Sequence, residues 1–161
     1  MRTVHEYTTN LIWTGNNGKG TTAYNGYDRS FEVNMKYKES IYGSSDPAFM
    51  GDRTKTNPEE LLLASVSSCH MLWYLHLCAV NDVIVTKYEA SADGAMTEYS
   101  NGSGSFTSIQ LNPVVLVANE GMIGKALALH AEANRVCFVA NSLKIKVNHN
   151  AVIRIEGTRD G

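Results

Sequence analysis

Blocks of strand-forming residues alternate with blocks of turn-forming residues in the first third of the chain. Residues 5–13 and 20–35 are rich in Thr, Tyr, Val and Phe, which favours strands, and the Gly and Asn residues at 15–18 are typical of a hairpin turn. Residues 37–55 contain many Gly, Ser, Asp and Pro residues and predict a loop with a short strand near Ile41. This region therefore predicts two or three antiparallel strands.

A long apolar helix is predicted from Pro58 to about Val80. Asn57 can cap its first turn, Pro58 suits the first helical position, and Glu60 stands where a capping box needs a carboxylate. Apolar residues fall on nearly every side of this helix, so it needs cover all round and is expected at the centre of the fold. Five Ser and His residues interrupt the apolar run, which favours a buried helix over a membrane span.

The rest of the chain predicts two strands, a helix and a last strand. Residues 83–92 and 105–118 have the pattern of an antiparallel pair, with a turn over 99–104. Asn119 is expected to cap a helix over 120–136, followed by a short helical piece over 137–143 and a final strand within 144–155. The order predicts one α+β domain over residues 1–161, with antiparallel sheets wrapped around the helices.

Composition and charge narrow the function classes. The chain is 43% hydrophobic and 19% charged, with a formal net charge of −2, so we expect neither a nucleic-acid partner nor an anionic membrane. A small or apolar partner fits better. The first residues show no apolar run of the kind found in signal peptides, which predicts a cytoplasmic location.

The chain has three cysteines, a small and odd number, which argues against the disulfide framework of a secreted protein. Cys69 and Cys78 are nine residues apart on one helix and should point to opposite faces, so Cys78 is expected to be inert. Cys137 is the natural second thiol for Cys69. A buried cysteine is more often a small hydrophobe than a nucleophile, and this reading stays open. No metal site is expected, because the cysteines and histidines lack a close ligand spacing.

Ser67, Ser68 and His70 place polar side chains next to Cys69 in an otherwise apolar helix. The alternative to a chemical role is that the serines bond back to the preceding turn and that a backbone carbonyl satisfies His70. A free thiol with a pKa of about 8.5 is only about 3% thiolate at neutral pH, so a reactive cysteine needs a nearby cation. The helix dipole fades within the first turn. Arg53 and Arg29 are the charges that precede the helix.

The sequence Thr56-Asn57-Pro58-Glu59-Glu60-Leu61-Leu62, followed by Cys69 and later by a second cysteine motif over 137–143, resembles the OsmC/Ohr family of osmotically inducible and organic-hydroperoxide-resistance proteins. The resemblance covers nearly the whole chain. It implies an intertwined α+β homodimer with two central helices, no bound cofactor, and two active sites at the subunit interface. It further implies a reset by an external dithiol protein, such as one carrying a dihydrolipoyl group.

The resemblance also implies residue roles: Cys69 as the peroxidatic thiol, Cys137 as the resolving thiol, and Glu59 as the carboxylate that orients a catalytic arginine. Glu59 and Cys69 are about 15 Å apart along one helix, so a shared pocket needs Glu59 from the other subunit. Phe138 stands where the family usually has proline. The family's arginine has no clean match, which leaves Arg53, Arg29 and an auxiliary His70 as candidates.

The function expected on this basis is a peroxidase that reduces organic or lipid hydroperoxides to alcohols. The Cys69 thiolate would attack the peroxide, and Cys137 would then close a disulfide with the resulting sulfenic acid. A non-catalytic binding or scaffold protein on the same fold, with an apolar ligand, is the alternative. A hydrolase using Cys69 with His70 ranks third, because adjacent residues of a helix do not face each other.

Overall fold

Residues 3–155 are described by a computed structural model of the chain. They divide into two units, one up to Leu62 and the other from Leu63 onward. Helix α1 (Pro58–Val80) contains this boundary.

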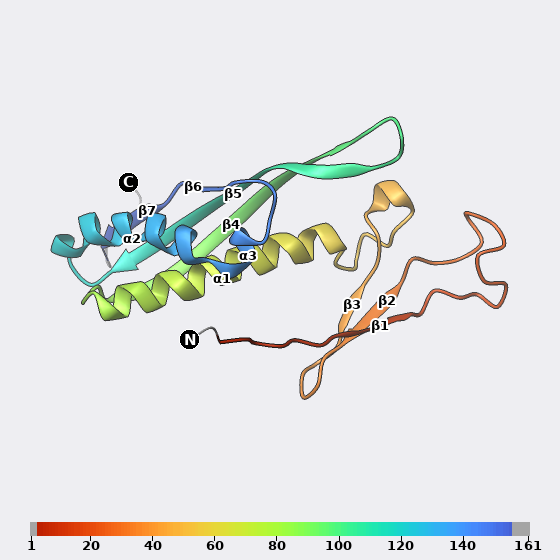
Figure 1. Cartoon of the computed structure of the whole chain (residues 1–161), viewed down its shortest axis with the longest axis horizontal. Coiled ribbons are helices and arrows are strands. Elements are labelled where there is room, and N and C mark those ends of the chain that lie inside the picture. The colour runs from red at the N-terminus through yellow and green to blue at the C-terminus, as the bar shows by residue number, and fades with distance from the viewer. Residues whose placement is uncertain (1–2, 156–161) are drawn as a thin grey trace. The chain divides into compact units, whose positions relative to one another are not determined.

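A three-stranded antiparallel sheet forms the centre of the first unit (Figure 1). Its strands are β1 (Asn10–Trp13), β2 (Phe31–Asn34) and β3 (Ile41–Gly43), in that order. The predicted antiparallel strands are confirmed, but they are much shorter than 5–13 and 20–35. The backbone between them closes a long loop instead, with Thr14 bonded to Ser30 and Asp28 to Gly15. A side chain at Gly15 would place its Cβ 1.8 Å from the Asp28 carbonyl oxygen, so only glycine fits there.

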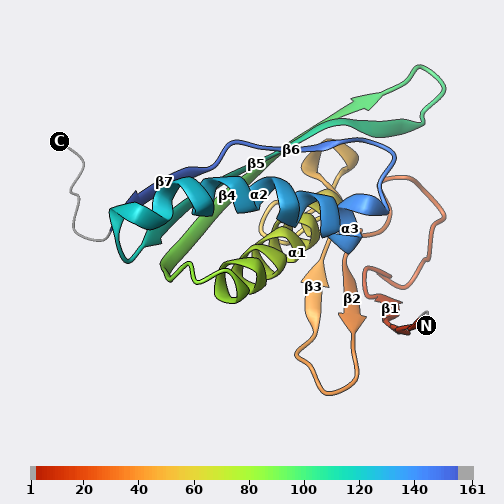
Figure 2. The ribbon, with the colours of Figure 1, turned by 60° about the vertical axis from the view of Figure 1, so that its left-hand side comes forward.

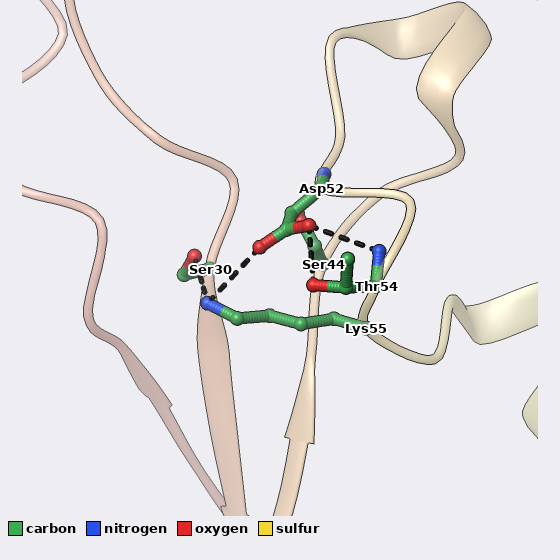
Figure 3. A network of polar contacts seen from close by, with 5 residues as sticks. All are labelled: Ser30, Ser44, Asp52, Thr54 and Lys55. Carbon is green, nitrogen blue, oxygen red and sulfur yellow. Dashed lines mark hydrogen bonds and ion pairs between the residues drawn. The ribbon is translucent and has the colours of Figure 1, made fainter.

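The loop that leads to α1 is held by a network of polar contacts around Asp52 (Figure 3). The Asp52 carboxylate accepts hydrogen bonds from the backbone N–H and the hydroxyl of Thr54, at 2.9 and 2.7 Å, and lies 3.8 Å from the Lys55 ammonium. Lys55 also donates to the Ser30 hydroxyl, and the Asp52 N–H donates to Ser44. The short 3₁₀ helix η1 (Pro47–Phe49) precedes this network. The helix and the polar contacts together give this loop a defined conformation.

Both ends of α1 are those that the sequence predicts. The side chain of Asn57 accepts from the N–H of Glu60 at 2.8 Å, and Glu60 accepts from the N–H of Asn57 at 3.1 Å, which is a complete capping box. At the other end Asp82 adopts a left-handed φ of 58°, and the Val83 N–H bonds the Cys78 carbonyl at 3.0 Å. This is a Schellman ending.

A long antiparallel hairpin forms the sheet of the second unit, from β4 (Val85–Glu98) and β5 (Gly104–Val117). The predicted pair is confirmed, although β4 begins later and runs further than 83–92. The predicted final strand over 144–155 is two short strands, β6 (Val147–His149) and β7 (Val152–Ile155). Both pair with β5 in parallel, so this sheet is mixed. A helical crossover after β5 brings the chain back in the same direction, which explains the parallel pairing.

The helical crossover consists of η2 (Glu120–Met122), α2 (Ile123–Val136) and α3 (Phe138–Asn141). The prediction that Asn119 caps a helix from residue 120 is wrong in detail, because its side chain makes no capping bond and the first turn is a 3₁₀ helix. Gly121 lies in that turn and disfavours α-helix there. The short helix is also smaller than 137–143, with Cys137 as its N-cap.

Helices α1 and α2 lie along the β4–β5 hairpin in both views (Figures 1 and 2). The core between them contains buried residues from α1, β5 and α2. Only one stripe of α1 is fully buried within the described chain, and it consists of Val66, His70, Tyr74 and Cys78. The prediction of cover all round is therefore not met by this chain alone: Leu72 is 62% exposed and Val80 63%.

By length and composition, α1 is also able to cross a membrane, and core helices of soluble proteins pass the same test. Its buried stripe contains a histidine and a tyrosine that pack on other elements of the same unit.

Candidate active site

Two thiols from different elements meet on one side of α1. The sulfur of Cys137, which lies between α2 and α3, is 2.8 Å from the sulfur of Cys69 in the middle of α1. Both cysteines are free thiols. Cys69 is half-buried and Cys137 fully buried. The structure therefore brings together the two cysteines that the sequence analysis paired.

The environment of Cys137 keeps its thiol protonated. Burial raises the pKa of the Cys137 thiol to about 11, and the hydrogen bond to the sulfur of Cys69 acts in the same direction. The sulfur also accepts a weak hydrogen bond from the Ala140 N–H at 3.5 Å, as the cap of α3. Cys137 is therefore the donor in its contact with the Cys69 sulfur.

An open pocket of about 520 Å³ lies against the Cys69 side of α1. Its lining residues follow one stripe of α1 and the start of α3, and they are Ser65, Ser68, Cys69, Leu72, Trp73, His76, Phe138 and Val139. The rings of Trp73 and Phe138 meet edge to face at 5.3 Å. This volume is in the range of pockets that hold small organic molecules.

Phe138 occupies the first position of α3, where proline is also favoured. The Cys137 cap forms with phenylalanine at this place, so the departure from the usual proline leaves the local turn intact. The Phe138 ring is 67% exposed and adds an aromatic surface to the pocket.

None of the residues that line this pocket is a lysine or an arginine. The predicted activating groups belong to the first unit. Arg29 donates to the carbonyls of Tyr24 and Tyr27, and its guanidinium lies over both rings. Arg53 is exposed on the loop before α1, and Glu59 is half-buried in the first turn of the helix. The roles of Arg29, Arg53 and Glu59 at the thiols stay predictions.

Cys78 lies on the other side of α1 and is 1% exposed. Burial raises the pKa of its thiol, and Tyr74 is its neighbour on the helix. The two cysteines of α1 thus have opposite surroundings, with one thiol in a pocket and the other sealed in the core.

Three imidazoles gather on the buried side of the same helix. Nε2 of His70 lies 3.0 Å from Nδ1 of His130 on α2, and both side chains are fully buried. The His149 ring of β6 lies 5.7 and 6.0 Å from these two rings, and the Tyr74 ring stacks on His130 at 3.8 Å. The alternative that a backbone carbonyl satisfies His70 is wrong, since its partner is His130.

Burial lowers the pKa of both buried histidines, to about 4 for His70 and about 3 for His130. The neighbouring imidazoles act in the same direction. Both rings are therefore neutral near pH 7, and one of the two nitrogens in the bond must carry the proton. Nδ1 of His70 and Nε2 of His130 have no hydrogen-bond partner among the described residues.

Sequence reasoning gave His76 and His130 no role at this site. His76 and Trp73 lie seven and four residues after Cys69, which is the spacing of one helix face, so helical periodicity from Cys69 identifies the pocket wall. His130 has no such signal, because its pairing with His70 depends on tertiary packing. Among residues 3–155, no group of three or more His, Cys, Asp or Glu side chains is arranged to hold a metal ion.

The described chain resembles several solved structures. An OsmC-like protein of unknown function from Vibrio cholerae is 26% identical, with a TM-score of 0.83 over 92% of this chain and 100% of that one. An organic hydroperoxide resistance protein from Elizabethkingia anophelis is 15% identical, with a TM-score of 0.69 over 95% of this chain and 98% of that one. The organic hydroperoxide resistance protein OhrB of Bacillus subtilis is 15% identical, with a TM-score of 0.62 over 92% and 98%.

These likenesses support the OsmC-like α+β fold. A search of curated protein sequences finds no match. The family model of OsmC-like proteins matches residues 51–151, which include both thiols and the whole of α1. The chain therefore belongs to the OsmC family.

Proposed function

We propose that the protein is a thiol peroxidase that reduces organic hydroperoxides to alcohols. The observation that carries the proposal is the pair of free thiols, Cys69 and Cys137, whose sulfurs are 2.8 Å apart beside an open apolar pocket. Two related folds come from proteins named for organic hydroperoxide resistance. This chemistry needs one reactive thiol, a second thiol within reach and room for the substrate.

In the first step the Cys69 thiolate attacks the distal oxygen of the hydroperoxide. The O–O bond breaks, Cys69 becomes a sulfenic acid, and the alkoxide takes a proton and leaves as the alcohol. In the second step the Cys137 thiol attacks the sulfenic sulfur. A disulfide forms and water leaves. An external dithiol then reduces this disulfide by two exchange steps and is itself oxidised.

The pocket lining favours an organic substrate over hydrogen peroxide. Leu72, Trp73 and Phe138 offer an apolar surface on the side of α1 where Cys69 opens. Burial of an alkyl or aryl group against this surface would contribute about 25 cal/mol per Å² of apolar area removed from water. A lipid or aryl hydroperoxide gains this contribution and hydrogen peroxide does not.

Activation of Cys69 needs a cation from outside the pocket lining. The Cys137 S–H is a neutral donor, and a neutral hydrogen bond contributes less than a charge-assisted one. We assign the cationic role to Arg53 or Arg29, with Glu59 as the carboxylate that orients the arginine. His70 is the weaker auxiliary, because its ring is buried and bonded to His130.

The protein is proposed to act as a homodimer in the cytoplasm. Exposed apolar side chains on α1, among them Leu72 and Val80, leave part of this helix without cover from its own chain, and a second subunit would supply that cover. Light scattering after gel filtration should give about twice the monomer mass of 17.7 kDa. A monomer at micromolar concentration would contradict this.

The decisive experiment titrates the reduced protein with cumene hydroperoxide and counts free thiols. The wild type should lose two thiols per chain and release one cumyl alcohol. Cys69→Ser should lose no thiols on this time scale. The matched control Cys78→Ser should behave like the wild type, because Cys78 is buried in the core.

Two results would contradict the peroxidase proposal. One is that the wild type does not lose two thiols per chain when it is mixed with one equivalent of hydroperoxide. The other is that the Cys69→Ser variant still loses thiols. Either result, combined with tight binding of an apolar ligand that quenches Trp73 fluorescence, would support the non-catalytic binding protein instead.

A further inference from the structure

A hydrogen bond between His70 and His130 joins α1, which carries Cys69, to α2, whose C-cap is Cys137. His70 follows Cys69 on α1, and His130 precedes Cys137 by seven residues on α2. Both imidazoles are fully buried and are bonded at 3.0 Å. Among the described residues, the other side-chain hydrogen bond between α1 and this part of the chain is the Cys137–Cys69 contact at the C-cap of α2. The thiol chemistry proposed above makes no use of the histidine bond.

The remaining contacts between the two helices are apolar and stacking contacts. Ala126 and Ala133 of α2 are buried in this core, and Ile123 and Leu129 are half-buried there. The Tyr74 ring of α1 also stacks on His130. A hydrogen bond depends steeply on distance and angle. The His70–His130 bond therefore adds a directional restraint on the position of α2 along α1, which apolar and stacking contacts do not supply.

A rigid path leads from His130 to the sulfur of Cys137. Asn141 on α3 donates its side-chain amide to the Arg135 carbonyl near the end of α2, and its backbone N–H bonds the Cys137 carbonyl. Asn134 ties the same part of α2 to β6 through the Val147 carbonyl at 2.9 Å. A shift of α2 would accordingly move Cys137 with it.

We propose that His70 and His130 are positioning residues for disulfide closure, and that their hydrogen bond holds the Cys137 sulfur against Cys69. Closure shortens the sulfur–sulfur distance to about 2.05 Å and demands a defined dihedral angle. A misplacement of about 1 Å lowers the rate of such a step by up to about a hundredfold. The inference rests on the proposed function, in which Cys137 thiol attacks the Cys69 sulfenic acid and water leaves.

The test separates formation of the sulfenic acid from its conversion to the disulfide. Reduced protein is mixed with cumene hydroperoxide, quenched with dimedone at set times, and analysed by mass spectrometry for dimedone adduct and disulfide. In His130→Leu the disulfide should form at least about tenfold more slowly, so the adduct at Cys69 should accumulate. The rate of Cys69 oxidation should change less than about twofold.

Two further variants separate positioning from folding. In His130→Asn a side-chain amide takes the place of Nδ1 and can bond His70, so closure should return to within about threefold of the wild type. In the double variant His70→Leu/His130→Leu no buried nitrogen is left unpaired, so thermal stability should recover. Closure should stay slow, because the directional bond is still missing.

Normal closure in folded His130→Leu or in the double variant would overturn the inference, and so would a failure of His130→Asn to restore it. A parallel series with diamide, which oxidises the two thiols to a disulfide and becomes the hydrazine, needs no peroxidase activity. If the wild type closes with diamide but ignores hydroperoxide, the proposed function fails alone. The same ranking of variants with diamide would still support the positioning role.

Discussion

Two stripes of α1 run side by side and have opposite surroundings. The open stripe includes Cys69, Trp73 and His76 and lines the pocket. The buried stripe includes His70, Tyr74 and Cys78 and packs on the sheet and α2. Each stripe has a cysteine and a histidine. The comparison teaches that two cysteines of one helix can differ completely in their partner and in their access to solvent.

The open stripe should be the one on which reactivity depends most strongly. With Cys137→Ser the Cys69 sulfenic acid has no second thiol, so excess hydroperoxide should oxidise it further to the sulfinic acid. We expect activity with a dithiol to fall at least about a hundredfold within a few turnovers. Repeated additions of cumene hydroperoxide, followed by intact-mass measurement, check this.

The matched control for Cys137→Ser is Cys78→Ser on the buried stripe. It should survive the same additions with activity within about twofold of the wild type. Equal inactivation of both variants would remove the difference between the two stripes.

The buried stripe should dominate the pH dependence of stability. The pKa values of about 4 for His70 and about 3 for His130 lie below the value of about 6.5 for an unfolded histidine. Between these values the unfolded chain binds more protons than the folded one, so acid favours unfolding. Stability is complete above about pH 6.5 and falls as the pH drops toward 4, by about 1.4 kcal/mol per pH unit for each histidine.

Urea unfolding between pH 7 and 4 measures this slope. The variant His70→Leu/His130→Leu should show a flatter profile in this window, while His76→Leu on the open stripe should leave it unchanged. A slope that stays the same without the histidine pair would show that other groups cause the acid sensitivity.

Much of this molecule was predictable from local sequence. The capping box of Asn57 and Glu60 located α1 to the residue, because cap and partner are three residues apart and need no tertiary information. The family resemblance marked Cys69 and Cys137 as a pair, and their sulfurs are in contact. The parallel pairing of β6 and β7 was not predictable, since strand direction depends on where the helical crossover returns the chain.

The histidine pair shows the same limit at the level of single residues. Sixty residues separate His70 from His130, and each on its own is an ordinary histidine in an apolar segment. Their bond exists because two helices pack at one particular position. The cation that would activate Cys69 is hard to predict for a related reason, because the candidate arginines and the thiols belong to different units of the chain.

The third prediction concerns the two cysteines of α1. Cys78→Ser replaces a buried thiol with a more polar hydroxyl in an otherwise apolar site, where Tyr74 is its polar neighbour, and burial of an incompletely paired hydroxyl costs about 1–3 kcal/mol. Cys69→Ser places it at the edge of a pocket, where the cost should stay below about 0.5 kcal/mol. Urea midpoints of the two reduced variants compare these costs directly. The reverse order would mean that Cys69 is the better packed side chain in solution.

The smallest effect is expected at Phe138, which widens the open stripe with an aromatic ring. Phe138→Ala removes the edge-to-face contact with Trp73 and part of the pocket wall, worth about 0.5–1.5 kcal/mol beyond the area lost. We expect KM for cumene hydroperoxide to rise about three- to tenfold with little change in kcat, because the ring binds substrate and does not touch the reacting sulfur.

Two controls show whether Phe138 acts through substrate binding. The smaller tert-butyl hydroperoxide buries less apolar area, so its KM should rise less in Phe138→Ala than that of the aryl substrate. Phe138→Pro keeps a residue suited to the first position of α3, so Cys137 should stay in place and kcat should hold while KM rises. A fall in kcat for both substrates would instead mean that the ring positions the thiols, and the pocket wall would then be part of the resolving element.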